Sequence, residues 1–159
     1  MKKFCLFLFT VVSLSVFTAC DNPEIDIHEV LFKEPCLEWG TSLSRVQSYM
    51  SEYEKGNSSA IKRGDYYLYW YYPKYLESEI QYYFASETSN LQRCNVFFDP
   101  KDVGMRDILE FFNKLSDKYL YLGDEDDVYY YKSKDETTFV GITTNTEGKY
   151  LVIYLDNRE

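Results

Sequence analysis

Two stretches of this chain carry apolar residues at helical spacing, and each is followed by three strand-like runs. Within residues 41–56 the apolar positions are Leu43, Val46, Met50 and Tyr53, which lie three or four residues apart. A capping hydroxyl residue precedes them and a glycine follows. Residues 102–119 repeat this pattern behind an aspartate in the capping position, with apolar residues at Met105, Ile108, Phe112, Leu115 and Tyr119. The spacing predicts two amphipathic helices.

Six segments rich in aromatic and β-branched residues predict strands. Three follow the first helix: "DYYLYWYY" (65–72), "EIQYYFAS" (79–86) and "RCNVFFD" (93–99). Three follow the second helix: "DVYYYKS" (127–133), "TTFVGITT" (137–144) and "YLVIYLD" (150–156). Polar breaks separate all of them.

The shared order of elements predicts a tandem repeat. Leu43 aligns with Met105 at an offset of 62 residues, and Val96 aligns with Ile153 at an offset of 57. A longer connection in the first half accounts for the difference. We therefore expect an α+β fold with two tandem αβββ repeats, 36–100 and 101–159. They would form one curved antiparallel sheet with two helices packed on one face.

The aliphatic residues of the third strands predict which face of the sheet the helices cover. We expect the inward set to be Cys94, Val96 and Phe98, matched by Leu151, Ile153 and Leu155, with Leu68 and Val128 on the first strands. A register error of one residue would exchange the two faces. The open face would carry the candidate binding residues Tyr67, Tyr69, Tyr71, Tyr83, Phe97, Tyr129, Tyr131 and Tyr154.

The leader "MKKFCLFLFTVVSLSVFTAC" has the parts of a secretory signal peptide: two lysines, a short apolar run and small residues before a cysteine. "FTAC" resembles a bacterial lipobox, which implies removal of residues 1–19 and lipidation of Cys20. Phe17 departs from this pattern, which usually has an aliphatic residue there. The alternative is an ordinary secreted protein in which Cys20 is incidental. Several acyl chains would anchor the protein stably.

Residues 20–35 show no sustained period and predict a lipid-anchored tether. Asp21, Glu24 and Asp26 lie just beyond the anchor, and such acidic runs resemble an export tag of some Gram-negative lipoproteins. We expect the bacterial cell envelope, at the outer membrane, and leave open whether the protein faces the periplasm or the surface.

Charge excludes one class of partner. The leader holds two lysines and no acids, so a formal charge of −9 becomes −11 after its removal. Such a chain repels phosphate backbones, and no basic patch with interleaved aromatics is present in the sequence. We expect no nucleic-acid partner.

Catalytic chemistry has little support. The one histidine, His28, lies in the predicted tether, and the sequence holds no nucleophile elbow, P-loop or zinc-protease motif. The acidic run "GDEDD" (123–127) could hold calcium but lacks the ligand order of an EF-hand, so a solvated turn is the preferred interpretation. We expect no enzyme activity, no metal and no cofactor.

Cys36 and Cys94 are the other cysteines of the mature chain. In an oxidising envelope they could pair and contribute about 4 kcal/mol. The alternative is two separate thiols buried as small apolar side chains.

The opening "WGTSLSRV" (39–46) before a strand triplet resembles the helix opening of small outer-membrane lipoproteins of the SmpA/OmlA type. The doubled helix-plus-sheet layout is similar to the repeats of β-lactamase inhibitory proteins. The second half lacks the Trp-Gly pair, because Lys101 and Asp102 stand there. The resemblance implies binding to protein rather than catalysis.

The 17 tyrosines exceed what packing a small domain requires, and tyrosine suits binding surfaces. We expect a non-catalytic module that binds an envelope or extracellular protein through the Tyr-rich open face. The alternative is a glycan-binding surface lipoprotein, with sugars stacked on exposed rings and Gln81, Asn95 and Asp99 at the sugar edge.

The anchor yields a direct prediction. The substitution Cys20→Ser should abolish incorporation of labelled palmitate and release the protein from membranes, because the acylated sulfur is lost. Membrane fractionation with the wild type as control measures this. Continued palmitate labelling of the variant would contradict lipidation at Cys20.

Overall fold

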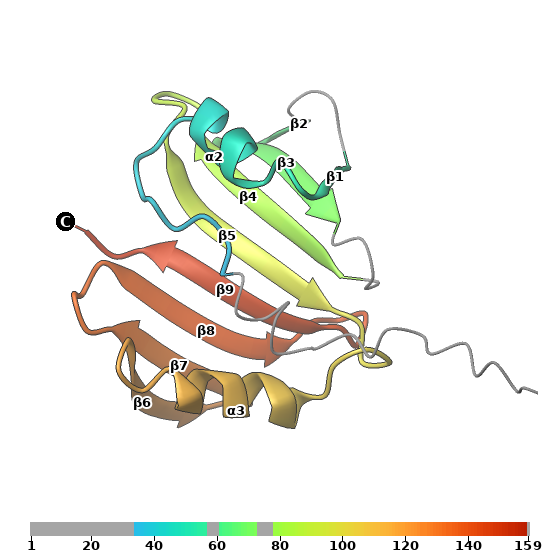
Figure 1. Cartoon of the computed structure of the whole chain (residues 1–159), viewed down its shortest axis with the longest axis vertical. Helices are drawn as coiled ribbons and strands as arrows, with labels where there is room; N and C mark the ends of the chain where they lie inside the picture. Colours follow the sequence, from blue (N-terminus) through green and yellow to red (C-terminus); the bar gives the residue numbers. More distant parts are fainter. Residues whose placement is uncertain (1–33, 57–60, 73–77, 159) are drawn as a thin grey trace, which may run out of the picture.

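The computed structural model describes residues 34–56, 61–72 and 78–158. They form an antiparallel β-sheet with two short helices, so the protein belongs to the α+β class, as expected (Figure 1). The helices are α2 (Leu43–Tyr49) and α3 (Met105–Lys114). The strands are β1 (Glu54–Lys55), β2 (Ile61–Arg63), β3 (Tyr66–Tyr72), β4 (Glu79–Ala85), β5 (Leu91–Phe98), β6 (Tyr119–Glu125), β7 (Val128–Ser133), β8 (Thr138–Thr144) and β9 (Tyr150–Asp156).

The sheet order is β1-β3-β4-β5-β9-β8-β7-β6, and β2 also pairs with β3. Each pairing is antiparallel. Strands β5 and β9 therefore join the two halves of the chain at the centre of the sheet, although more than fifty residues separate them (Figure 1).

Both helices are shorter than their sequence patterns. Helix α2 ends at Tyr49, and the chain turns before it enters β1. Helix α3 starts at Met105 rather than directly after Asp102. The carboxylate of Asp107 accepts the Gly104 N–H at 2.9 Å, which satisfies a donor that the helix itself leaves unpaired. The N-cap residue is therefore Gly104 rather than Asp102, and its backbone N–H is bound by the Asp107 side chain one turn inside the helix.

The first half contains β1 and β2 besides its three predicted strands, and the second half has four strands, so the αβββ description is wrong for both halves. Residues at the end of the predicted helix and in the predicted acidic turn form β6 instead. Only Asp126 and Asp127 form the turn to β7, with φ values of 50° and 61°. Two consecutive left-handed residues characterise a type I′ hairpin, and aspartate tolerates that conformation better than most residues.

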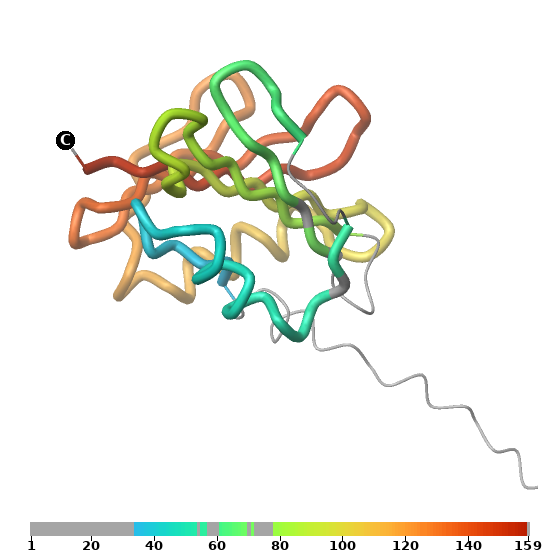
Figure 2. The backbone as a smooth tube through the Cα atoms, turned by 90° about the horizontal axis from the view of Figure 1, so that it is seen from above, coloured from blue at the N-terminus to red at the C-terminus, as the bar shows by residue number. Residues whose placement is uncertain are grey.

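The core lies between the helices and one face of the sheet. Seen from above, the backbone of both helices lies on the same side of the sheet (Figure 2). Val46 of α2 and Ile108, Phe111 and Phe112 of α3 are fully buried and belong to one hydrophobic cluster with the strands. The Phe112 ring lies 5.0 Å from Tyr131, 5.3 Å from Tyr119 and 6.3 Å from Tyr154, measured between ring centroids. Phe112 thus joins three strands of the second half.

The register shows that the core face is the tyrosine face. One row of cross-strand neighbours runs through Tyr69, Tyr82, Cys94, Tyr154, Val140 and Tyr131. Cross-strand neighbours share a face, and Tyr82 and Cys94 are completely buried. Six of the eight predicted open-face residues therefore lie on the core face, and that prediction is wrong for Tyr67, Tyr69, Tyr71, Tyr129, Tyr131 and Tyr154.

The error has a physical cause. Cys94, Val96 and Phe98 do face the core, as predicted, but their partners on β9 are Tyr154, Val152 and Tyr150. Leu151, Ile153 and Leu155 consequently point away from the helices, and so do Leu68 and Val128. Most tyrosines of the central strands therefore lie in the core layer, and the aliphatic residues of β9 lie on the outer face.

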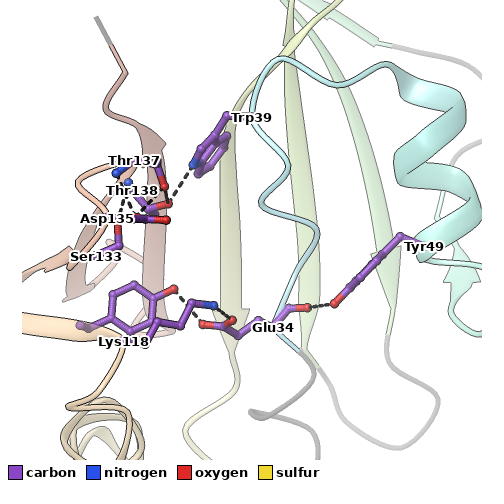
Figure 3. Close-up of polar contacts among 9 residues, drawn as sticks. Glu34, Trp39, Tyr49, Lys118, Ser133, Asp135, Thr137 and Thr138 are labelled. Carbon is purple, nitrogen blue, oxygen red and sulfur yellow. Dashed lines mark hydrogen bonds and ion pairs between the residues drawn. The ribbon is translucent and has the colours of Figure 1, made fainter.

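Residues 34–41 fill the space between the two helices. The N–H of Cys36 donates to the Tyr82 hydroxyl at 2.8 Å, and the Trp39 indole donates to Thr138 Oγ1 at 2.8 Å. The backbone carbonyl of Glu34 accepts the Tyr49 hydroxyl at 2.7 Å, and its carboxylate accepts the Tyr119 hydroxyl at 2.8 Å (Figure 3). This segment, called the strap below, therefore contacts both halves.

The two faces predict different costs of truncation. Phe112→Ala should lower the free energy of unfolding by about 4 kcal/mol, because it empties the centre of the core. Phe139→Ala removes the same ring from the half-exposed outer face and should cost only about 1–2 kcal/mol. Equilibrium urea unfolding measures both. Equal losses would contradict the assignment of faces.

Candidate binding surface

The candidate site is the sheet face that points away from the helices, called the open face below. Its residues follow from the register, in which Phe97 pairs with Leu151, Asn95 with Ile153, and Phe139 with Leu155. None of these six side chains belongs to the hydrophobic core cluster. The face is therefore a second, separate surface of the same sheet.

One part of the open face is apolar. We call the following six side chains the apolar patch: Phe97, Tyr130, Phe139, Leu151, Ile153 and Leu155. They come from four adjacent strands, β5, β9, β8 and β7, and all are only partly buried. The rings of Tyr130 and Phe139 lie 5.8 Å apart with a 38° tilt. Contiguous apolar patches on a protein surface are uncommon and commonly mark binding sites.

The neighbouring part of the open face is a closed polar network. Arg93 Nε donates to Asn95 Oδ1 at 2.8 Å, and Asn95 Nδ2 donates to the Tyr83 hydroxyl at 3.3 Å. The Tyr83 hydroxyl in turn donates to Gln81 Oε1 at 2.6 Å. Asn95 is 2% exposed, so its amide is buried and bonded at both ends. These side chains form hydrogen bonds with one another and not with a ligand.

The guanidinium carbon of Arg93 also lies 5.1 Å from the centre of the Tyr83 ring, within cation–π range. Tyr66 meets the same ring edge-on at 6.1 Å. Burial raises the pKa of the Tyr83 hydroxyl, and the nearby arginine partly opposes that rise. The hydroxyl therefore stays protonated at neutral pH and acts as a hydrogen-bond donor.

Two predicted binding residues lie on the open face, Tyr83 and Phe97. Sequence reasoning missed the other five members of the apolar patch because it assigned the aliphatic residues of β9 to the core. A usable signal was present in β4, where Glu79, Gln81 and Tyr83 alternate with Ile80, Tyr82 and Phe84. Pairing outward from that unambiguous strand would have placed Tyr69 inward, opposite Tyr82.

Several predicted features lie outside the described residues: the leader, the lipidation site Cys20, most of the tether and His28. Cys36 and Cys94 are described, and both are free, buried thiols, so the structure contains no disulfide between them. Burial raises the pKa of each thiol. The alternative of two separate apolar thiols fits the structure.

Among the residues with described positions, no group of three or more His, Cys, Asp or Glu side chains is arranged to hold a metal. The acids of "GDEDD" lie exposed along β6 and its turn. No helix in the described part of the chain is long and apolar enough to cross a membrane.

A cavity of about 330 Å³ lies beside the strap, lined by Leu37, Lys118 and the β7–β8 turn. Its polar groups already have partners: the Asp135 carboxylate accepts the hydroxyls of Ser133 at 2.6 Å and Thr137 at 2.9 Å (Figure 3). These bonds lower the pKa of Asp135 and keep it ionised. We therefore interpret the cavity as space left by the packing of the β7–β8 turn and not as a ligand site.

Comparison with known proteins found no match to a family model, to a curated protein or to a solved structure. The likeness to SmpA/OmlA-type lipoproteins and β-lactamase inhibitory proteins stays a prediction.

The buried thiols predict slow alkylation. Iodoacetamide at neutral pH should leave Cys36 and Cys94 unmodified in the folded protein and modify both within minutes in urea, because burial suppresses the reactive thiolate. Peptide mass spectrometry without reductant measures each site separately. A Cys36–Cys94 cross-linked peptide would contradict the free-thiol state.

Proposed function

We propose that this protein is a lipid-anchored, non-catalytic protein-binding module of the bacterial cell envelope, and that it docks its partner on the open face. The apolar patch carries this proposal: six partly exposed aromatic and aliphatic side chains lie together on four adjacent strands. The anchor rests on the lipobox-like sequence around Cys20. A partner that is also anchored at the membrane would lie within reach of this sheet face.

The chemistry of the patch defines the partner. A few large apolar anchors supply most of the affinity at protein interfaces, and polar side chains around them exclude water. Arg93, Asn95 and Tyr83 form such a border along one side of the apolar patch. The mature chain carries a formal charge of −11. We therefore propose an envelope or extracellular protein with an apolar surface and a basic rim, because opposite charge accelerates encounter.

Protein fits this surface better than glycan. A sugar platform needs free amides or carboxylates at the edge of an exposed ring. The amides of Gln81 and Asn95 bond within the network, and Asp99 accepts the N–H of Lys101 at 2.9 Å. The side chains proposed for sugar contact are therefore already engaged.

We further infer that the two halves are a tandem repeat, each with a helix on the same face of the sheet. The pairings support equivalence of Tyr69 with Tyr131, Tyr82 with Val140, and Cys94 with Tyr154. These positions lie 62, 58 and 60 residues apart. Every pair shares a face because all six residues lie in one row of cross-strand neighbours. The offset of 57 differs by an odd number from the offset of 60 between Cys94 and Tyr154, so it matches residues on opposite faces of β5 and β9.

The docking proposal is tested by the double substitution Phe139→Thr with Ile153→Thr. Threonine retains strand propensity while it removes apolar surface, so the fold should persist and binding should weaken about tenfold or more. The measurement is quantitative capture from solubilised envelopes with the full chain as bait, followed by titration with the purified captured protein.

The matched control is Ile61→Thr, which removes an apolar side chain that is 41% exposed from edge strand β2, away from the apolar patch. Wild type and control should bind alike. Equal binding by all three proteins would exclude the open face. Loss only in the control would move the partner to the β2 edge.

A further inference from the structure

Strand β6 forms one edge of the sheet and carries the most exposed apolar side chains of the described residues. Leu120 is 49% exposed, Tyr121 50% and Leu122 54%, and they are consecutive. Beyond β6 no further strand lies among the described residues. An exposed apolar edge strand is a template for pairing with another chain, which proteins normally avoid.

The backbone of β6 presents free pairing groups at this edge. The Lys134 N–H donates to the Lys118 carbonyl at 2.9 Å, so Lys118 faces β7 with its backbone groups. In an antiparallel ladder, the backbone groups of successive residues point alternately toward the neighbouring strand and away from it. The carbonyl of Tyr119 and both backbone groups of Tyr121 therefore face outward. Glu125 pairs with Val128 across the two-residue turn, so the backbone groups of Glu125 face β7. The backbone groups of the preceding residue, Asp124, therefore face the free edge.

Charge is distributed unevenly along β6. Lys118 precedes the strand, and Asp124, Glu125, Asp126 and Asp127 end it, all of them exposed. An antiparallel copy of the same strand would bring each basic start against an acidic end. A parallel copy would bring acid against acid. Lys118 already forms an ion pair with Glu34 of its own chain, so the antiparallel orientation is the less repulsive of the two rather than fully complementary.

We propose that β6 pairs antiparallel with β6 of a second copy of this chain, so that two sheets join edge to edge in a symmetric dimer. The β-bulge at Leu122 determines the register, because it shifts the alternation of faces by one residue. Side chains stay on matching faces when Tyr121 lies opposite Leu122 of the other copy and Lys118 lies opposite Glu125. In that register Tyr119 meets Asp124, and both direct backbone groups to the edge.

This pairing is limited to two copies of the chain. A two-fold interface uses the same edge of both copies and leaves no β6 edge free for a third chain. The opposite edge of the sheet consists of the short strands β1 and β2, with two and three residues. The two-fold axis is perpendicular to the sheet, so both open faces of the dimer point the same way. The inference does not depend on what the open faces bind.

Site-directed cross-linking of the full chain in isolated membranes tests the dimer. In the Tyr121→Cys variant, a short bismaleimide should link two copies, because the two substituted positions are diagonal neighbours across the axis. Lys62→Cys on β2 is the matched control, because this position is also exposed but lies at the opposite edge. We expect about tenfold more dimer from the β6 variant on denaturing gels. Equal yields from the two variants would overturn the proposal.

A charge exchange tests the register. Adding Glu125→Lys to the Tyr121→Cys variant should lower the dimer yield about threefold, because lysine then faces Lys118 twice per dimer. Adding Lys118→Glu as well should restore it in protein whose thermal unfolding shows that the fold persists without the Lys118–Glu34 ion pair. Failure of the double exchange to restore cross-linking would overturn the antiparallel register, even if Tyr121→Cys alone cross-links. Thermal unfolding of each variant identifies losses caused by misfolding.

Discussion

The structure depends on covering a sheet face that is made largely of tyrosine. Tyrosine buries a large ring, but its hydroxyl needs a hydrogen-bond partner when water is excluded. Helices of seven and ten residues leave a gap between them, and the strap fills it. There Tyr82 accepts the Cys36 N–H and donates to the sulfur of Met50 at 3.2 Å, while Tyr119 donates to Glu34. The strap thus supplies polar partners where helices alone would supply only apolar contacts.

This arrangement separates the two faces by chemistry. The covered face holds large rings, and Phe112 contacts the rings of three strands. The hydroxyls of Tyr82 and Tyr119 are bonded, whereas the buried Tyr71 hydroxyl has no partner among the described residues. The open face holds a mixed patch of aromatic and aliphatic side chains beside a closed polar network. Rings packed edge-on and tilted resist rearrangement, so the core maintains the geometry of the sheet. The open face remains accessible for binding.

The two edges of the sheet also differ. At one edge the strands are short, and the positively charged Lys62 and Arg63 lie exposed on β2. At the other edge β6 has seven residues, exposed apolar side chains and a bulge. A bulge limits pairing with arbitrary strands, because only a partner with a matching irregularity keeps its register. A second copy of the same strand has that irregularity.

The sequence by itself determined the fold class, both helices, all six predicted strands and the inward side of β4 and β5, because each follows from local periodicity. It could not determine which residues of β3, β7 and β9 face the core. These strands carry aromatic or aliphatic residues on both sides, as in "VYYYKS" and "YLVIYLD", so either assignment buries apolar surface. Strand β6 was also hidden, since its apolar start continues a helical pattern and its end is acidic. The tertiary structure decided these features, because cross-strand pairing transmits the phase of one unambiguous strand to all its neighbours.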